Sequence, residues 1–576
     1  MKKLLTLLSA FCLMATCCAC SKHAGQSDTP APSAGGNSDV TETAPAETGE
    51  KTATPETIIC SMYIHQGETF SEPIYSYELL PDRTARIAGY YGDLRDIVCI
   101  PESVDGYTVS VIGKHAIPDY PHNSEAKIYI PESVTVIESD AFDNIHTTVQ
   151  FTLPETHPAF QIVDGALICP AEKRIIRGRI RGDYSIPEGI EQLDSHAFWG
   201  SNFTSIHIPG SVTKLGNNPF AACNTDADAY TSLRGITLAE ENTALEIRDG
   251  VLFSREDHRL VWCFLWDYDK AMNYSIPEDV RIIDDCAFWR WNRTVSVTIP
   301  AGVAEVGIIP FRDQRDELIL RLDENNEALS YVNGMLISWA DQRLVCMIRS
   351  EEDIITIPEG TEIIGDYAFY YFRTMKEQKV ILPDTVTVIG AKAFAGYQGP
   401  VSIPAGVRDI GCCAFSQSMS ANESLSITGD VRIGSFAFSE CSGIVILTTE
   451  GNIQIGMGAF EGCWNLQNVR IGGGETRVMP CAFQLCNRLE RAEIGEGTDY
   501  LGAAAFRMCR SLQSVSLPAS LKYIGEQALY NQAEQMHNEE YDIYTMVYSC
   551  SAQILVAAGS YAEQYCKDNG ITYTCR

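Results

Sequence analysis

The sequence predicts a β-rich repeat solenoid, built from short strands, turns and inserted β-hairpins and ending in a short helical cap. Two repeat patterns support this prediction: an Ala-Phe pair returns every 21 to 23 residues, and a longer hairpin-like segment returns after 85 and 84 residues. One short unit cannot bury its own apolar face, so a fixed period of this length indicates stacked units that form a continuous core.

Residues 1–20 predict a lipoprotein signal peptide. Two lysines precede an apolar run from Leu4 to Ala15, and small residues follow it. Cys20 resembles the cysteine that receives the lipid in bacterial lipoprotein signals. Cys17 is the rival site, and a secretory signal without lipid is the alternative. A lipid on Cys20 would anchor the chain at the extracytoplasmic surface of a bacterial cell.

Residues 21–56 predict a disordered tether rich in Ser, Thr, Pro, Ala and Glu. This segment has no aromatic residue and almost no aliphatic residue, so it has nothing from which to build a core. The formal net charge of the whole chain is −32. A strongly acidic protein repels phosphate backbones, so we expect no nucleic-acid partner.

The repeat unit is clearest at 512–529, which reads LQSVSLPASLKYIGEQAL. An alternating Val-x-Leu segment predicts a strand with one buried face, and Pro ends it because Pro cannot donate to the ladder of hydrogen bonds. The glycine after the second aliphatic pair predicts a tight turn. The Ala-Phe position that follows places an aromatic ring in the core. Phe220 and Phe311 follow Pro instead of Ala and are interpreted as degraded copies.

Three longer segments predict β-hairpins. Residues 164–178, 249–263 and 333–347 each contain two apolar runs separated by a polar turn. Each leads into an ordinary repeat, so the middle of the chain alternates ordinary coils with coils that carry a hairpin.

Together these units resemble the BspA-like leucine-rich repeats of bacterial surface proteins. The resemblance covers about residues 75–576 and rests on the I-P-x-x-V-x-x-I-G-x-x-A-F unit, the Asp-Gly hairpin and both ends. It implies an N-terminal cap at 57–95, a solenoid at 96–548 and a C-terminal cap at 549–576, in which a short helix follows the last strand.

Cysteine recurs three residues after the repeat phenylalanine, at 223, 441, 463, 486 and 509. Other repeats place Ile, Trp, Phe or Tyr there, which favours an apolar packing slot over a disulfide or a metal site. Ser201 and Ser418 occupy the same slot and suggest that some coils pack it loosely. Cys566 and Cys575 are the best candidates for a disulfide. Parallel side chains do not converge on a metal ion, so we expect no metal and no cofactor.

The sequence contains no recognisable catalytic motif, and we expect no enzymatic activity. A hydrolase with a convergent site is a remaining alternative. Candidate ligand-binding residues are outward-facing strand positions and tryptophans near the hairpins: Tyr129, His207, Arg470, Glu493, Trp262, Trp266 and Trp339. For the tryptophans the rival interpretation is that they cover the junction between hairpin and solenoid.

The resemblance implies a non-enzymatic binding or adhesion protein that presents an extended surface for protein–protein recognition. Expected partners are extracellular or envelope proteins, including host matrix proteins or glycans. The chain would contact the membrane only through the N-terminal lipid. The alternative is a structural or scaffold lipoprotein of the bacterial envelope.

Overall fold

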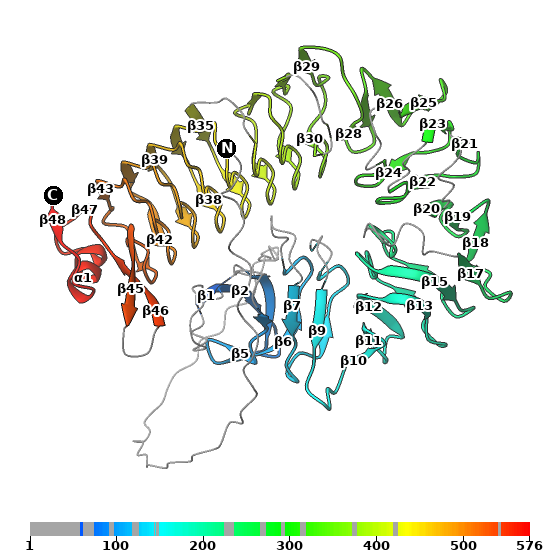
Figure 1. Ribbon diagram of the computed structural model, residues 1–576, viewed down its shortest axis with the longest axis horizontal. Coiled ribbons are helices and arrows are strands. Elements are labelled where there is room, and N and C mark those ends of the chain that lie inside the picture. The colour runs from blue at the N-terminus through cyan, green and yellow to red at the C-terminus, as the bar shows by residue number, and fades with distance from the viewer. Residues whose placement is uncertain are drawn as a thin grey trace, which may run out of the picture. The chain divides into compact units, whose positions relative to one another are not determined.

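The computed structural model describes residues 58–61, 74–90, 97–117, 126–142, 145, 149–223, 235–264, 272–289, 294–311, 318–370, 372, 377–418, 424–538 and 543–576. The chain forms two units, residues 1–54 and residues 55–576, and everything described lies in the second. That unit is a β-solenoid of about 18 turns, which confirms the predicted fold class. Figure 1 shows its coils following one another along the chain. The signal peptide and tether predicted at 1–56 lie outside the described residues.

One side of the coils carries the longer strands, which we call the long-strand ladder. Its strands pair in parallel between consecutive coils, as β39 with β41 and β41 with β43. Buried and exposed residues alternate along them, because successive side chains point to opposite faces of a sheet. The strands are β4 (Ile97–Cys99), β7 (Ala126–Tyr129), β9 (Val149–Thr152), β13 (Arg181–Ser185), β15 (Asn202–Ile208), β17 (Ile236–Leu238), β21 (Met272–Ser275), β23 (Thr294–Ile299), β25 (Ile319–Leu322), β29 (Ile354–Thr356), β31 (Lys379–Ile381), β33 (Val401–Ser402), β35 (Ser424–Thr428), β37 (Ile446–Glu450), β39 (Asn468–Gly472), β41 (Arg491–Ile494), β43 (Ser514–Ser516), β47 (Gln553–Val556) and β48 (Tyr573–Cys575).

A second set of strands, mostly of two or three residues, forms the short-strand ladder. These strands precede the turn that carries the Ala-Phe pair, and they also pair in parallel. They are β8 (Val136–Ile137), β14 (Gln192–Leu193), β16 (Lys214–Leu215), β22 (Ile282–Ile283), β24 (Glu305–Val306), β30 (Ile363–Ile364), β32 (Val388–Ile389), β34 (Asp409–Ile410), β36 (Val431–Ile433), β38 (Ile453–Ile455), β40 (Thr476–Val478), β42 (Thr498–Leu501) and β44 (Tyr523–Ile524).

The three predicted hairpins are confirmed, and each is extended by a third antiparallel strand. The extra strand joins through an Asp-Gly or Asn-Gly pair in which both residues have positive φ, as Asp164 (49°) and Gly165 (87°) do. This is the geometry that two-residue hairpin turns require. The strands are β10 (Gln161–Val163), β11 (Ala166–Cys169) and β12 (Arg174–Gly178), then β18 (Leu245–Arg248), β19 (Val251–Ser254) and β20 (Arg259–Cys263), then β26 (Leu329–Val332), β27 (Met335–Ser338) and β28 (Arg343–Met347).

Both ends of the unit differ from the repeat. The N-terminal sheet contains β1 (Ile58–Ser61), β2 (Ile74–Leu79), β3 (Ala85–Tyr90), β5 (Ser103–Val104) and β6 (Tyr107–Ile112). A hairpin of β45 (Gln532–Asn538) and β46 (Ile543–Ser549) precedes the C-terminal end. The predicted cap helix is α1 (Tyr561–Asp568), in which the Ser560 hydroxyl accepts a hydrogen bond from the Glu563 amide. None of the described residues forms a helix long and apolar enough to span a membrane.

The repeat phenylalanines form a continuous stack inside the coils. Phe394, Phe415, Phe438, Phe460 and Phe483 follow one another at ring-centroid distances of 5.0–5.4 Å, with ring planes within 11° of parallel. Phe220 and Phe311 are also buried, and they stack on the preceding phenylalanine at 5.7 and 5.4 Å. In these two copies of the repeat, proline replaces the neighbouring alanine and the aromatic position is kept.

The recurring cysteines pack in the core. Cys441, Cys463, Cys486 and Cys509 are completely buried. Each thiol donates a hydrogen bond to the carbonyl of the phenylalanine in the preceding coil, at 2.9–3.1 Å. Burial raises the pKa of Cys441 to about 12, so this thiol stays protonated at neutral pH.

The neighbouring predictions have mixed outcomes. No disulfide joins the cysteines of the described residues, and Cys566 is buried while Cys575 is exposed, so the pairing suggested for these two is wrong. The suggestion of loose packing is also wrong. Ser201 and Ser418 are completely buried, and the Ser418 hydroxyl donates to the Tyr397 carbonyl at 2.8 Å. A serine suits the slot because its hydroxyl, like the thiol, has a carbonyl to bind.

The recurring glycine serves close approach between coils and not an unusual dihedral angle. Gly434 and Gly456 lack positive φ values. A Cβ atom on Gly456 would lie 2.6 Å from the Gly434 carbonyl carbon. The glycines therefore let the turns of successive coils touch, which corrects the expectation of a turn that needs glycine for its backbone conformation.

The short-strand side also contacts itself across a long stretch of sequence. Cys413, Phe436 and Met457 belong to the same buried cluster as residues of the N-terminal coils between Tyr75 and Ile176. A second cluster joins Trp199, Trp289 and Tyr367 from separate coils. Part of this side is consequently covered by the chain itself.

We expect Phe460→Ala to lower the free energy of unfolding by about 3–5 kcal/mol, because it opens a cavity in the middle of the aromatic stack. Trp464→Ala in the same coil is the matched control. Trp464 is 50% exposed, so its loss should change stability by no more than about 0.5 kcal/mol. Urea unfolding followed by circular dichroism measures both. Equal effects of the two substitutions would contradict the role given to the stack.

Candidate functional site

The candidate ligand-binding residues on the long-strand ladder lie on three different sheets. Tyr129 is on β7 and His207 is on β15, where a ring nitrogen of His207 lies 2.9 Å from the Thr237 hydroxyl. Arg470 and Glu493 are directly opposite each other on β39 and β41, with Nε and Oε2 3.9 Å apart. Both side chains are strongly exposed, at 70% and 65%. The structure thus brings together only the last two of these residues.

The tryptophan candidates separate into different environments. Trp262 is 2% exposed and stacks on Phe220 with a centroid distance of 5.3 Å, so it has no surface for a ligand and the rival packing interpretation holds for it. Trp339 is 38% exposed and its indole N–H donates to the Ser330 hydroxyl at 3.1 Å. Trp266 and the proposed lipidation site, Cys20, lie outside the described residues.

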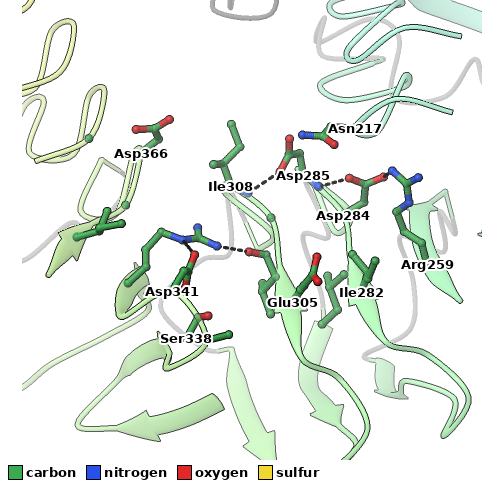
Figure 2. A pocket seen from close by; sticks show the side chains of 18 of the residues that line it. Asn217, Arg259, Ile282, Asp284, Asp285, Glu305, Ile308, Ser338, Asp341 and Asp366 are labelled. Carbon is green, nitrogen blue, oxygen red and sulfur yellow. Dashed lines mark hydrogen bonds and ion pairs between the residues drawn. The ribbon is translucent and has the colours of Figure 1, made fainter. Parts of the chain in front are cut away.

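A cavity with a volume of about 870 Å³ lies against the short-strand ladder. Strands β22, β24, β30 and β32 and the turns after them line it. Figure 2 shows Asp285 beside Ile308, with Asp284 and Arg259 on one side and Asp341 on the other. Six carboxylates line the cavity together with two arginines: Asp257, Asp284, Asp285, Glu305, Asp341 and Asp366, with Arg259 and Arg343.

Two adjacent aspartates connect four coils at this cavity. The Asn218 amide donates to Asp284 at 2.9 Å, and its side-chain amide donates to the Asp285 carbonyl at 2.6 Å. The Asp285 carboxylate accepts from the Ile308 amide at 2.7 Å and lies 3.2 Å from a ring nitrogen of His196. These side chains are almost completely buried, so their polar atoms need such partners.

An arginine bridges each place where a hairpin enters the short-strand ladder. Among the described residues, the short-strand ladder has three gaps, at which β8, β16 and β24 do not pair with the strands that follow them in the ladder, β12, β20 and β28. Arg174 donates across the first gap to the Ile137 carbonyl. Arg259 donates to the Leu215 and Gly216 carbonyls at 3.2 and 3.1 Å, and Arg343 donates to the Val306 carbonyl at 2.7 Å. The guanidinium groups thus satisfy strand carbonyls that face the gaps.

Each of these arginines is held by a carboxylate two residues earlier in the hairpin: Glu172, Asp257 and Asp341. In the first two cases a second, buried carboxylate comes from the next coil. Asp194 pairs with Arg174, and Asp284 pairs with Arg259. At the third hairpin, Gly365 occupies the repeat position that Asp194 and Asp284 occupy at the other two, so Arg343 has no second carboxylate from that position. The Arg343 side chain is also more exposed, at 18% against 7% for Arg174.

Burial governs the ionisation of the two second carboxylates. It raises the pKa of Asp284 to about 7, with help from the neighbouring Asp285 charge and against the attraction of Arg259. It raises the pKa of Asp194 to about 6, against the attraction of Arg174. The pKa values of Arg174 and Arg259 are also raised. For these groups burial alone would lower the pKa, but the nearby carboxylates outweigh burial and favour the charged guanidinium.

This arrangement is built for holding coils together. Asp284 and Asp285 accept hydrogen bonds from backbone amides and from side chains of other coils, as given above. In the part of the chain that the structure describes, no group of three or more His, Cys, Asp and Glu side chains could hold a metal ion.

The arginine bridges were missed by sequence reasoning, although a signal for them exists. An acidic residue, any residue and arginine recur at 172–174, 257–259 and 341–343, with the same spacing as the hairpins. Aspartate also replaces the repeat glycine at 194 and 284. A buried charge on the hairpin requires a partner, and these replacements are the partners.

The family model for the BspA type leucine rich repeat region, six copies long, matches residues 114–162, 182–237, 362–490 and 431–543. The chain is thus similar to that family at both ends of the repeat array and through the regular coils. A comparison with curated proteins finds no match.

Several solved structures are similar to the chain at low identity. The pneumococcal vaccine antigen PcpA is 14% identical, over 90% of this chain and 99% of its own, with a TM-score of 0.29. A leucine rich cell surface protein from Faecalibacterium prausnitzii is 17% identical, over 89% and 98%, with a TM-score of 0.24. A leucine-rich repeat protein from Bacteroides ovatus is 17% identical, over 79% and 96%, with a TM-score of 0.23.

The raised pKa of Asp284 predicts a characteristic pH dependence. Its carboxyl titrates near 3.9 when unfolded and near 7 when folded, so folding takes up protons between these values. Its contribution to stability is complete below about pH 4 and is lost as the pH rises to about 7. In Asp284→Asn this pH-dependent contribution to the free energy of unfolding should disappear. The number of protons taken up on folding near pH 5.5 should fall by up to about one.

Asp279→Asn is the control of opposite sign. A hydrogen bond from Arg248 lowers the pKa of Asp279, so its contribution is present above the unfolded pKa and is lost as the pH falls. Urea unfolding at a series of pH values from 2 to 8 distinguishes the two variants. If the free energy of unfolding of Asp284→Asn changed with pH as steeply as that of the wild type, the assignment of the raised pKa to Asp284 would be contradicted.

Proposed function

Because the chain belongs to the BspA-type leucine-rich repeat proteins, we propose that it is a non-enzymatic binding protein of the bacterial cell surface. It recognises protein partners through an extended surface of parallel strands. Many contacts of modest strength, made in register along successive coils, supply the affinity. Adhesion to extracellular or host proteins is the biological form of this activity.

The long-strand ladder between β35 and β43 supports this proposal most directly. Ser426, Arg470 and Glu493 have exposed side chains at the same register position on β35, β39 and β41, and Ile446 (41% exposed) lies on the neighbouring strand β37. Parallel strands are about 4.8 Å apart, so a partner meets one side chain per coil at a fixed interval. An exposed aliphatic residue beside exposed charges of both signs is suited to a protein partner.

The short-strand side is the less suitable face for a large partner. Its N-terminal coils pack against Cys413, Phe436 and Met457, and part of the remainder lines the cavity of about 870 Å³. A macromolecule would have to displace these contacts before it could bind there.

We expect Arg470→Ala to weaken binding to a protein partner by about tenfold, since a central arginine often contributes 1–2 kcal/mol to an interface. Arg477→Ala is the matched control from the same coil, because Arg477 lies on β40 of the short-strand ladder. The full chain is first tested on an array of matrix proteins, mucins and glycans, with unfolded protein as the reference. Equal loss in both variants, or loss only in Arg477→Ala, would contradict the proposed face.

The membrane anchor is the second part of the proposal. It rests on the signal at 1–20, with Cys20 as the lipidated residue, and on the tether at 21–56. A single acyl chain binds membranes weakly, whereas several chains on one cysteine hold a protein firmly. The tether would give the solenoid room to turn and meet its partner.

Expression of the full chain in a bacterial host tests the anchor. The wild type should partition into the detergent phase and incorporate labelled fatty acid, and Cys20→Ser should do neither. Cys17→Ser is the control and should behave like the wild type. Loss of label only in Cys17→Ser would assign the lipid to that residue, and label-free wild-type protein would contradict the anchor altogether.

A further inference from the structure

We infer that Cys412 and Cys413 form a thiol–disulfide exchange site, which reacts with small disulfides such as oxidised glutathione. The two sulfur atoms are 3.5 Å apart. Cys413 has a φ of 54°, and the left-handed turn at this residue accompanies the approach of the two neighbouring side chains. The pair follows Gly411 in the turn after β34, immediately before the core residues Ala414 and Phe415.

The two thiols differ in access, as attacking and resolving cysteines do. Cys412 is partly exposed and lines a cavity of about 470 Å³. Cys413 is 1% exposed and belongs to the buried cluster shared with the N-terminal coils. A reagent in the cavity therefore reaches Cys412, and the Cys413 thiol lies 3.5 Å from the Cys412 sulfur.

Charged side chains of both signs line the cavity. Lys114 from the N-terminal coils lies there with Lys392 and Arg432 from the repeat and with the carboxylates Asp366 and Asp409. Lys114 is paired with Asp140 and Arg432 with Asp409, each at 2.9 Å. The cavity therefore offers polar groups of both signs to the charged ends of a small disulfide.

The reaction proceeds in two exchanges. The Cys412 thiolate attacks one sulfur of the reagent, forms a mixed disulfide and releases the first reagent thiolate. The Cys413 thiol then loses its proton and attacks the Cys412 sulfur, which releases the second reagent thiolate. Two electrons pass from the cysteine pair to the reagent disulfide, and the two protons lost by the cysteines convert the products to thiols.

The disulfide formed in this way is easily reversed. Cα atoms of adjacent residues are about 3.8 Å apart, which is shorter than the usual 4.4–6.8 Å across a disulfide. Such a bond is strained and readily reduced, as regulatory disulfides are.

The full chain is reduced, freed of reductant and exposed to oxidised glutathione under native conditions, then alkylated, unfolded and digested with trypsin. Cleavage after Arg408 and Arg432 gives a peptide in which Cys412 and Cys413 are the only cysteines. In the wild type this peptide should lose about 2 Da, the mass of two hydrogens, and carry no alkyl group. In Cys413→Ser it should instead retain a glutathione adduct on Cys412, because the resolving thiol is gone.

Three controls accompany the test. Cys575 is exposed and should form a stable glutathione adduct, since it has no neighbouring cysteine. The buried Cys441, Cys463 and Cys486 should react only after unfolding. Cys412→Ser, which changes the more exposed residue and serves if Cys413→Ser does not fold, should leave Cys413 unmodified until unfolding. Two alkylated cysteines in the wild-type peptide while Cys575 is fully modified, or a stable adduct on wild-type Cys412, would overturn the inference.

Discussion

The stacking of one coil directly on the next is the constraint on which the rest of this structure depends. Consecutive repeat phenylalanines are about 5 Å apart because the strands of neighbouring coils are hydrogen-bonded at that spacing. At this distance the turns nearly touch, which is why Gly434 and Gly456 have no room for a side chain. The thiols after the phenylalanines reach the carbonyls of the preceding coil for the same reason. Each feature of the repeat unit follows from the spacing.

The hairpins are the places where this regular stacking is interrupted, and there the chain uses charge in place of apolar contact. A guanidinium group spans a gap that strand pairing leaves open, because it carries several donors on a long side chain. Burying it is costly without an anion, and Asp194 and Asp284 supply one. The same burial raises the pKa of these carboxylates, so the stability of the hairpin-bearing coils is tied to pH.

Position within the coil decides what each cysteine can do. In the slot after the phenylalanine the thiol is enclosed, bonded to a carbonyl and kept protonated by burial. Cys412 lies two residues before the Ala-Phe pair. Its side chain faces a cavity and has a second thiol beside it. The two ladders also differ: the chain itself covers part of the short-strand side, and the long-strand ladder presents side chains in register.

The sequence by itself determined the repeat, its strands and hairpins, the capping helix and the packing role of the cysteine slot. These features are local or periodic, and Phe394 to Phe506 show the period without any knowledge of contacts. The tertiary structure alone decided that Trp262 is buried, that Arg470 meets Glu493, and that Arg259 finds Asp284. Contacts of this kind depend on which coils become neighbours and how far the array bends, and a repeat of nearly identical units leaves both undetermined.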